Sequence, residues 1–317
     1  YTADINSGTV RLRGTGTAAV NSIKFYKIGL GDNTSASSAG NVATIINTDV
    51  DSAVENLDTW AHASYRGAKY YISMNNSTNG EVGNIECLVT HNGSDAFITN
   101  YNDVFTGSNS LVNSLTADIS GDNVRLRASC SPNTAVKMYR VLLSDAESDA
   151  SSTNTKTVGQ TTTSSSASSM DSFVTDSANG VHYIVVGNSS SESASSISEV
   201  FVTTDGTDAY ISTGPSVSTK GSDQLTFTAA LSGTTVTVSS ASTSGASTTV
   251  NAYRVNMLRA SAGAATSEQV LVSTTQTITG AKTLSNTVVK MTNLPTSDPS
   301  VAGQLWNSSG TLKISAG

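Results

Sequence analysis

Residues 85–99 read I-E-C-L-V-T-H-N-G-S-D-A-F-I-T, and this stretch decides the fold of the chain. Two apolar, β-branched runs flank Asn92 and Gly93, a pair that accepts the two positive φ angles of a type I′ turn. The stretch is therefore predicted to be a β-hairpin closed by that turn. The same pattern returns 113 residues later as S-E-V-F-V-T-T-D-G-T-D-A-Y-I-S, residues 198–212. A hairpin repeated at this distance predicts a tandem array.

The segments around the hairpin repeat as well, and they divide the chain into four parts. Polar and apolar residues alternate along them, which predicts half-buried strands. The matching segments are residues 2–13, 116–127 and 228–239; residues 23–32, 136–145 and 250–259; and residues 57–73 and 170–186. The predicted parts are residues 1–32, the C-terminal half of an incomplete β-sandwich; residues 33–145 and 146–260, two β-sandwich repeats of about 113 residues; and residues 261–317, a C-terminal β-rich, fibre-like oligomerisation segment.

The predicted fold class is all-β, with each repeat an antiparallel, Ig-like β-sandwich. About seven short strands per repeat are expected between Gly-, Asn-, Asp- and Ser-rich turns, and no segment has a helical period. Trp60, its counterpart Phe173 and the nearby tyrosines are predicted to anchor the cores. Residues 1–32 amount to about half a sandwich, so they are expected to need an opposing sheet from elsewhere.

The composition excludes several classes of partner. The chain has 17 Lys and Arg against 24 Asp and Glu, which gives a net charge of −7 and a sequence pI near 4.9. This charge argues against nucleic acid or an anionic membrane surface as a partner. No apolar run approaches the roughly 20 residues that span a bilayer, so membrane insertion is not expected.

The two cysteines are predicted to be free thiols. Cys87 occupies the strand position that Val200 occupies in the second copy, so it is predicted to be a small core residue. Cys130 lies in a Ser-Pro-Asn turn region and is predicted to be in a loop. Two unrelated positions do not make a disulfide framework, and free thiols favour assembly in a reducing compartment.

No residue pattern typical of catalysis or metal binding was found. His62, His91 and His182 lack the spacing of a metal site, and the exchange of the last two between copies predicts that they face solvent. The grouped carboxylates are predicted to cap turns rather than to bind calcium or act as glycosidase acids. These groups are Asp49 with Asp51, Asp145 with Glu147 and Asp149, and Asp205 with Asp208. The chain is therefore expected not to be an enzyme, with no catalytic, cofactor-binding or metal-binding residue.

The C-terminal segment carries two motifs. The stretch T-Q-T-I-T-G-A-K-T-L, residues 275–284, resembles the Q-T-I-T/S-G-A-K-T-F element of tail-fibre sequences. The ending L-P-T-S-D-P-S-V-A-G-Q-L-W-N-S-S-G-T-L-K-I-S-A-G, residues 294–317, is similar to the ending of many phage structural proteins. With the repeat, these motifs make the chain resemble virion structural proteins of tailed bacteriophages, particularly marine cyanobacterial phages.

The resemblance implies a non-enzymatic tail or neck fibre that carries β-sandwiches outward for host attachment. It places the protein on the virion after assembly in the host cytoplasm, with other virion proteins and a host-surface polysaccharide or protein as partners. It implies no cofactor and specifies no receptor-binding residue. A head decoration or capsid-fibre protein, a bacterial surface adhesin and a polysaccharide depolymerase are the alternatives.

Residues 261–317 are expected to hold a parallel homotrimer together. Large apolar side chains are spread thinly through this segment, so a lone chain would bury little surface. Three chains around one axis would bury those positions and cover open strand edges. Within the segment, residues 305–306 and 311–314 flank an Asn-Ser-Ser-Gly turn and are predicted to form a short hairpin.

Overall fold

The structure is a computed structural model that describes residues 2–6, 9–13, 37–39, 42–107, 110–144, 150–151, 155–176, 178–258 and 294–317. Side chains are described for residues 50–107, 110–144, 155–159, 161–176, 178–257 and 294–317. The chain forms two compact units, Tyr1–Ala262 and Gly263–Gly317. The described residues contain strands and one 3-10 turn, Ser190–Glu192, but no α-helix. The predicted all-β class is therefore confirmed.

The first unit contains two repeats preceded by a short hairpin. The hairpin consists of β1 (Thr2–Asn6) and β2 (Thr9–Arg13), paired antiparallel. Repeat 1 consists of β3 (Ser37–Ala39), β4 (Val42–Val50), β5 (Glu55–Ala61), β6 (Gly67–Asn76), β7 (Val82–His91), β8 (Ala96–Phe105), β9 (Val112–Ser120), β10 (Asn123–Cys130) and β11 (Thr134–Leu143). Repeat 2 consists of β12 (Ala150–Ser151), β13 (Thr155–Thr163), β14 (Ser168–Val174), β15 (Ala178–Ser189), β16 (Ala194–Thr204), β17 (Ala209–Ser218), β18 (Leu225–Ser232), β19 (Thr235–Ser242) and β20 (Thr248–Leu258).

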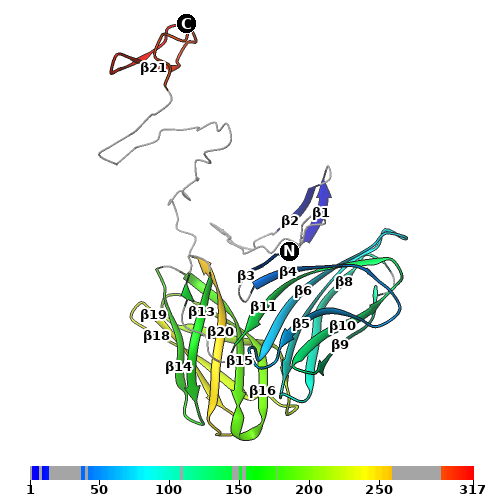
Figure 1. The fold of residues 1–317 in the computed structure, drawn as a ribbon. Helices are drawn as coiled ribbons and strands as arrows, with labels where there is room; N and C mark the ends of the chain where they lie inside the picture. The colour runs from blue at the N-terminus through cyan, green and yellow to red at the C-terminus, as the bar shows by residue number, and fades with distance from the viewer. Residues whose placement is uncertain are drawn as a thin grey trace. The chain divides into compact units, whose positions relative to one another are not determined.

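Each repeat is a sandwich of one six-stranded and one three-stranded sheet (Figure 1). Repeat 1 has the strand orders β3-β4-β11-β6-β7-β8 and β5-β10-β9, and repeat 2 has β12-β13-β20-β15-β16-β17 and β14-β19-β18. The two repeats thus share one topology, as their matched sequences predict. Nine strands per repeat are described, rather than about seven, partly because the Ser-rich linkers contribute the short strands β3 and β12.

The predicted hairpin forms, but its turn is not type I′. Strands β7 and β8 are joined by four residues, 92–95, and the side-chain Oδ1 of Asn92 accepts hydrogen bonds from the backbone N–H groups of Ser94 and Asp95 at 2.9 and 2.8 Å. Among these four residues only Gly93 has a positive φ, +96°. The side-chain oxygen of Asn92 satisfies two backbone donors, and this favours the longer loop.

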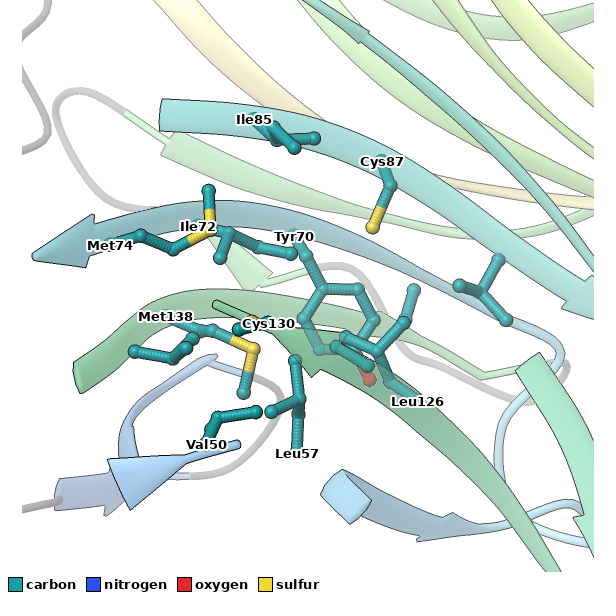
Figure 2. Packing of buried hydrophobic residues seen from close by; sticks show 14 of the residues in the cluster. Val50, Leu57, Tyr70, Ile72, Met74, Ile85, Cys87, Leu126, Cys130 and Met138 are labelled. Atoms are coloured by element: carbon teal, nitrogen blue, oxygen red, sulfur yellow. The ribbon is translucent and has the colours of Figure 1, made fainter. Parts of the chain in front are cut away.

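The core of repeat 1 lies between its two sheets. Trp60 is 4% exposed and Tyr70 is fully buried, so the predicted aromatic anchors are confirmed in this repeat. Around them pack aliphatic and sulfur-containing side chains from both sheets (Figure 2). In repeat 2, Phe173 and Tyr183 take the corresponding buried positions.

Both cysteines are buried free thiols. Cys87 lies on β7 in the core, as predicted, and burial raises the pKa of its thiol to about 12. The predicted loop position of Cys130 is wrong, because β10 continues to this residue and its backbone N–H donates to the carbonyl of Asp51 at 2.8 Å. Burial raises the pKa of the Cys130 thiol to about 11.

A buried polar network joins the two sheets of repeat 1. Asp58, on β5 of the three-stranded sheet, accepts hydrogen bonds at 2.6–2.8 Å from Arg140 on β11 and from the hydroxyl of Tyr70 on β6. The indole N–H of Trp60 donates to the same hydroxyl at 3.0 Å. The network therefore fixes how the two sheets stack.

Repeat 2 carries the same network at matching positions. Asp171 accepts from Arg254 at 2.6 Å and from the hydroxyl of Tyr183 at 3.1 Å, and Lys156 adds a contact at 2.8 Å. Desolvation by burial and the neighbouring carboxylate raise the pKa of Tyr183, so its hydroxyl stays protonated and able to donate. The main cation of this network is thus Arg140 in repeat 1 and Arg254 in repeat 2, which follow Tyr139 and Tyr253 in the sequence.

The second unit contains the predicted C-terminal hairpin, β21 (Leu305–Ser308) paired with β22 (Thr311–Ile314). Its two-residue turn places Ser309 at φ +51° and Gly310 at φ +91°, which is the pattern of a type I′ turn. The stretch 275–284 lies outside the described residues. In the described part of the chain, no helix has the length and apolar character needed to cross a membrane.

The prediction that residues 1–32 need an opposing sheet falls on side chains outside the described residues. The backbone of β1 and β2 forms two antiparallel paired strands, and strands were predicted in this segment.

Candidate functional site

The residues singled out in the sequence do not come together in one site. Among the described residues, no three His, Cys, Asp or Glu side chains form a group that could hold a metal ion. Asp205 caps the β16–β17 turn, as predicted: its carboxylate accepts the N–H groups of Thr207 and Asp208 at 2.8 Å and the hydroxyl of Tyr210 at 2.9 Å. These bonds lower the pKa of Asp205. Outside the described residues lie the side chains of Asp49, Asp145, Glu147 and Asp149.

The predicted solvent exposure of the histidines is wrong for His91. Its side chain is fully buried, with Nε2 2.8 Å from the carbonyl oxygen of Tyr65 and Nδ1 accepting the backbone N–H of Gly93 at 3.1 Å. His62 is half-buried and its ring lies 5.8 Å from that of His91. His182 is also largely covered, because Glu199 contacts it. Exchange of a residue type between copies therefore does not mark a surface position here.

Lys69 forms the centre of a charged cluster between the two repeats. Its side chain is fully buried, and its Nζ donates to Glu199 of repeat 2 at 2.5 Å. It also donates to Glu86 and contacts the hydroxyl of Tyr101, both in repeat 1. The Tyr101 hydroxyl in turn donates to Glu199, and His182 Nε2 lies 3.2 Å from the same carboxylate. A buried lysine is thus shared by one glutamate from each repeat.

The surroundings of Glu199 keep its carboxylate charged. Burial alone would raise its pKa, but hydrogen bonds from His182, Lys69 and Tyr101, together with the charge of Lys69, lower it to about 2. Burial and the neighbouring glutamates raise the pKa of Tyr101, so its hydroxyl remains a donor. The cluster therefore holds the repeats together through an ionised pair.

The cluster sits on a local pseudo-two-fold axis. Glu199 occupies in repeat 2 the position of Glu86 in repeat 1, and His182 occupies the position of Lys69. The outer faces of the six-stranded sheets meet so that β7 contacts β16, β8 contacts β17 and β11 contacts β20. Three strands of each sheet therefore contact their own counterparts, which is the pattern of an isologous interface.

One half of this interface is filled by aliphatic side chains. Gly67 allows the close approach, since a Cβ at that position would lie 3.1 Å from Cδ1 of Ile197 and 3.4 Å from Cγ2 of Val186. The buried cluster here consists of Leu88, Val141 and Leu143 from repeat 1 and Ile184, Val186 and Ile197 from repeat 2. This half is apolar, so burial of its surface favours docking.

The symmetry-related half is hollow. The positions of Val186 and Ile197 are taken in repeat 1 by Ser73 and Asn84, and neither lines the hollow. A cavity of about 290 Å³ remains there. Its lining is aromatic and aliphatic and consists of Tyr71, Tyr139, Val141, His182, Ile184, Tyr253, Val255 and Met257.

A second hollow of about 380 Å³ adjoins this cavity on the face of repeat 2. The two share His182 and Met257 in their linings. The rings of His182 and Phe201 stack at 4.3 Å with an interplanar angle of 3°. Phe201 is 43% exposed, whereas its counterpart Leu88 is fully buried. We call the two hollows together the aromatic groove.

The sequence did not indicate this groove, because it depends on docking between repeats. One signal was present: residues 181–186 read V-H-Y-I-V-V, a nearly continuous apolar run rather than an alternating one. Such a run is typical of a strand buried on both faces. The charged cluster carries no such signal, since Lys69 and Glu86 resemble ordinary surface residues of a strand.

The paired glutamates do not have the properties of a glycosidase site. Such a site needs one carboxylic acid with a raised pKa to protonate the leaving group. The pKa of Glu199 is lowered instead, and neither Glu199 nor Glu86 lines the aromatic groove. Their arrangement fits docking of the repeats.

No family model matches the chain, and no curated protein matches it significantly. The tailspike protein of Acinetobacter phage vB_ApiP_P1 is a similar solved structure, with 18% identity and a TM-score of 0.25 over 39% of this chain and 25% of the tailspike. The PBSX exported protein XepA is similar with 12% identity and a TM-score of 0.20, over 68% of this chain and 87% of that one. The chain spans only a quarter of the tailspike's length, and at these TM-scores neither similarity assigns a function.

Proposed function

We propose that this chain is a non-enzymatic structural component of a phage virion appendage, a tail or neck fibre, which carries β-sandwich repeats outward for host attachment. The observation that carries the proposal is the pair of same-topology sandwiches docked through Lys69 and Glu199, in a chain whose end resembles fibre sequences. Other virion proteins are its expected partners, and its expected place is the virion.

The docking supports a mechanical role. Sandwiches joined only by a linker would move independently, because small polar interfaces allow domain motion. Here a buried ion pair and an aliphatic cluster join the outer faces of the two six-stranded sheets. Such an arrangement resists bending, as a projecting appendage requires. Exposed turns such as residues 205–208 remain free to vary without disturbing the docked faces.

The test is to locate the protein on the particle. Antibodies raised against the full chain, applied to intact virions with gold labels, should mark the tail or the neck in electron micrographs. Labels distributed over the head would favour a decoration or capsid-fibre protein instead. Unlabelled particles, with the protein found on the bacterial surface, would refute the proposal in favour of an adhesin.

The enzyme alternative has a separate test. Incubation of the full chain with host capsular or cell-wall polysaccharide should release no reducing ends above the level of a heat-denatured control. Release above that control would identify a depolymerase and overturn the non-enzymatic role.

A further inference from the structure

We propose that the aromatic groove binds a neutral glycan. This inference deepens the attachment role proposed above and rests on it for its biological setting, whereas the recognition chemistry comes from the groove itself. The groove is lined by aromatic rings and by hydroxyl and amide groups, and a pyranose presents apolar faces and hydroxyl groups that can contact both.

The ring faces are unusually accessible for aromatic side chains. Phe201 and Tyr210 are 43% and 51% exposed and line the outer hollow. Three tyrosines and His182 line the inner cavity, where the rings of Tyr71 and Tyr139 lie 6.1 Å apart. Such rings give a large, rigid contact area at little conformational cost, and the C–H faces of a sugar ring can pack on them.

Amide and hydroxyl side chains lie among the polar groups of the groove. Asn179, Thr203 and Ser212 line the outer hollow beside the aromatic rings. Among the described residues that line the two hollows there is no Lys, Arg, Asp or Glu. A charged ligand would therefore lose its hydration without gaining an ion pair. Hydroxyl groups of a neutral sugar can instead exchange hydrogen bonds with the amide and hydroxyl side chains.

The size of the groove suits a short stretch of a chain of sugars. Specific ligand pockets are mostly apolar, carry a few polar groups and have volumes of roughly 300–1,000 Å³. The hollows of about 290 and 380 Å³ adjoin each other through His182 and Met257, so an extended ligand can occupy both.

The other half of the pseudo-symmetric interface serves as an internal comparison. Where the two repeats bury these same positions against protein, the lining is aliphatic and closely packed, as Leu88 and Ile197 show. In the groove the counterpart of Leu88 is the exposed Phe201. The nearest heavy atoms to a Cβ built at Gly180 all belong to β16 of repeat 2, whereas the one at Gly67 would contact the partner repeat. The lining of the groove is thus more aromatic and more polar than the aliphatic lining of the packed half of the interface.

The experiment uses the fluorescently labelled full chain on an array of oligosaccharides. The neutral probes are gluco-, galacto- and manno-oligosaccharides, and sulfated and sialylated glycans are the charged comparison. The variants Phe201→Ala and Tyr210→Ala change the groove, and Tyr210 is exposed enough for its loss to leave the fold intact. Phe97→Ala is the matched control, because Phe97 is the repeat 1 counterpart of Tyr210. Circular dichroism confirms folding of each variant.

We expect binding to one or more neutral glycans, weakened about tenfold or more by Phe201→Ala and by Tyr210→Ala but unchanged by Phe97→Ala. No binding to any neutral probe at millimolar concentration, binding only to charged glycans, or equal binding by all variants would overturn the inference.

Light scattering adds a further check: an oligomer that Phe201→Ala dissociates, without glycan binding, would show that the groove is an interface between copies. Gold labels on the tail with no glycan binding would support the proposed function and refute the glycan site. Glycan binding by a protein that is absent from virions would support the glycan site and refute the proposed function.

Discussion

Asp58 and Asp171 show how single residues organise each repeat. Each carboxylate lies on the three-stranded sheet and binds an arginine and a tyrosine from the six-stranded sheet. Because a buried carboxylate needs several partners to offset its desolvation, the positions of its partners are restricted. The same requirement explains why Arg140 recurs as Arg254 and Tyr70 recurs as Tyr183.

Lys69 should be the most sensitive charged residue for docking of the repeats. In Lys69→Met, the buried Glu199 and the half-buried Glu86 lose their shared cation, so we expect a loss of about 3–5 kcal/mol in the free energy of unfolding. The matched control is Lys156→Met, because Asp171 keeps Arg254 when Lys156 is removed, and its loss should be clearly smaller. Urea denaturation followed by circular dichroism measures both. Equal losses in the two variants would contradict a special role for Lys69.

The low pKa of Glu199 predicts that acid weakens the protein. Its folded pKa of about 2 lies below the ordinary value of 4.5, so the ionised form contributes stability that is fully present above pH 4.5. That contribution is lost as the pH falls toward 2. Glu199→Gln should therefore lower stability at neutral pH and show a shallower decline between pH 4.5 and 2. Urea midpoints across this range test the expectation, which parallel curves for both proteins would disprove.

Among the structural elements, the hairpins were predictable because their determinants are local. Alternating residues and an Asn-Gly or Asp-Gly pair suffice to indicate two strands and a turn. The turn type was mispredicted because Asn92 uses its side chain to bind the backbone, a choice that the pair alone does not reveal. The real two-residue turn of this kind lies at Ser309 and Gly310, a less favoured pair.

Gly93 and Gly206 should be required by their backbone conformation alone. Their φ angles are +96° and +92°, and a Cβ built on either would have no heavy atom within 4 Å. Replacement by Ala should therefore cost roughly 1 kcal/mol of stability through backbone strain without any steric clash. Ser94→Ala in the same turn is the control, because its φ is not positive. Thermal denaturation should show lower melting temperatures for both glycine variants and little change for the control.

The candidate site, unlike the hairpins, was not predictable from local sequence signals. Which face of β6 and β7 meets another sheet depends on docking between repeats, and that is a non-local property. The burial of Lys69 follows from such contacts, so its charge does not indicate its position, whereas His91 is buried within repeat 1 against Tyr65 and Gly93. The run at 181–186 indicated burial on both faces, but it could not indicate the partner.

At the scale of the whole molecule, the two repeats of the first unit stack four sheets: a three-stranded sheet packs on each six-stranded sheet, and the two six-stranded sheets pack on each other. Each six-stranded sheet therefore has apolar residues on both faces. The pseudo-two-fold relation between the repeats divides their interface into two equivalent halves, which differ in how well they are filled. One half stabilises the docking and the other leaves the aromatic groove.

The second unit leaves apolar side chains uncovered that a stable assembly would bury. Val301, Leu312 and Ile314 are 56%, 54% and 69% exposed in the single chain. Exposed apolar residues on a two-stranded hairpin are unfavourable in isolation, because such a hairpin is marginally stable in water. We predict that three parallel chains bury them against one another around one axis and form a homotrimer.

Light scattering on the full chain and on a chain ending at Ala262 tests the trimer, since the first compact unit ends there. The full chain should have three times the mass of a protomer and the shortened chain the mass of one. The double change Leu312→Ser and Ile314→Ser should also shift the full chain toward monomer, because polar hydroxyls would replace the buried contacts. Val104→Ser, at an equally exposed valine of repeat 1, should leave the trimer unchanged. A monomeric full chain would remove the trimer altogether, and a shortened chain that stayed trimeric would place the contacts in the sandwiches instead.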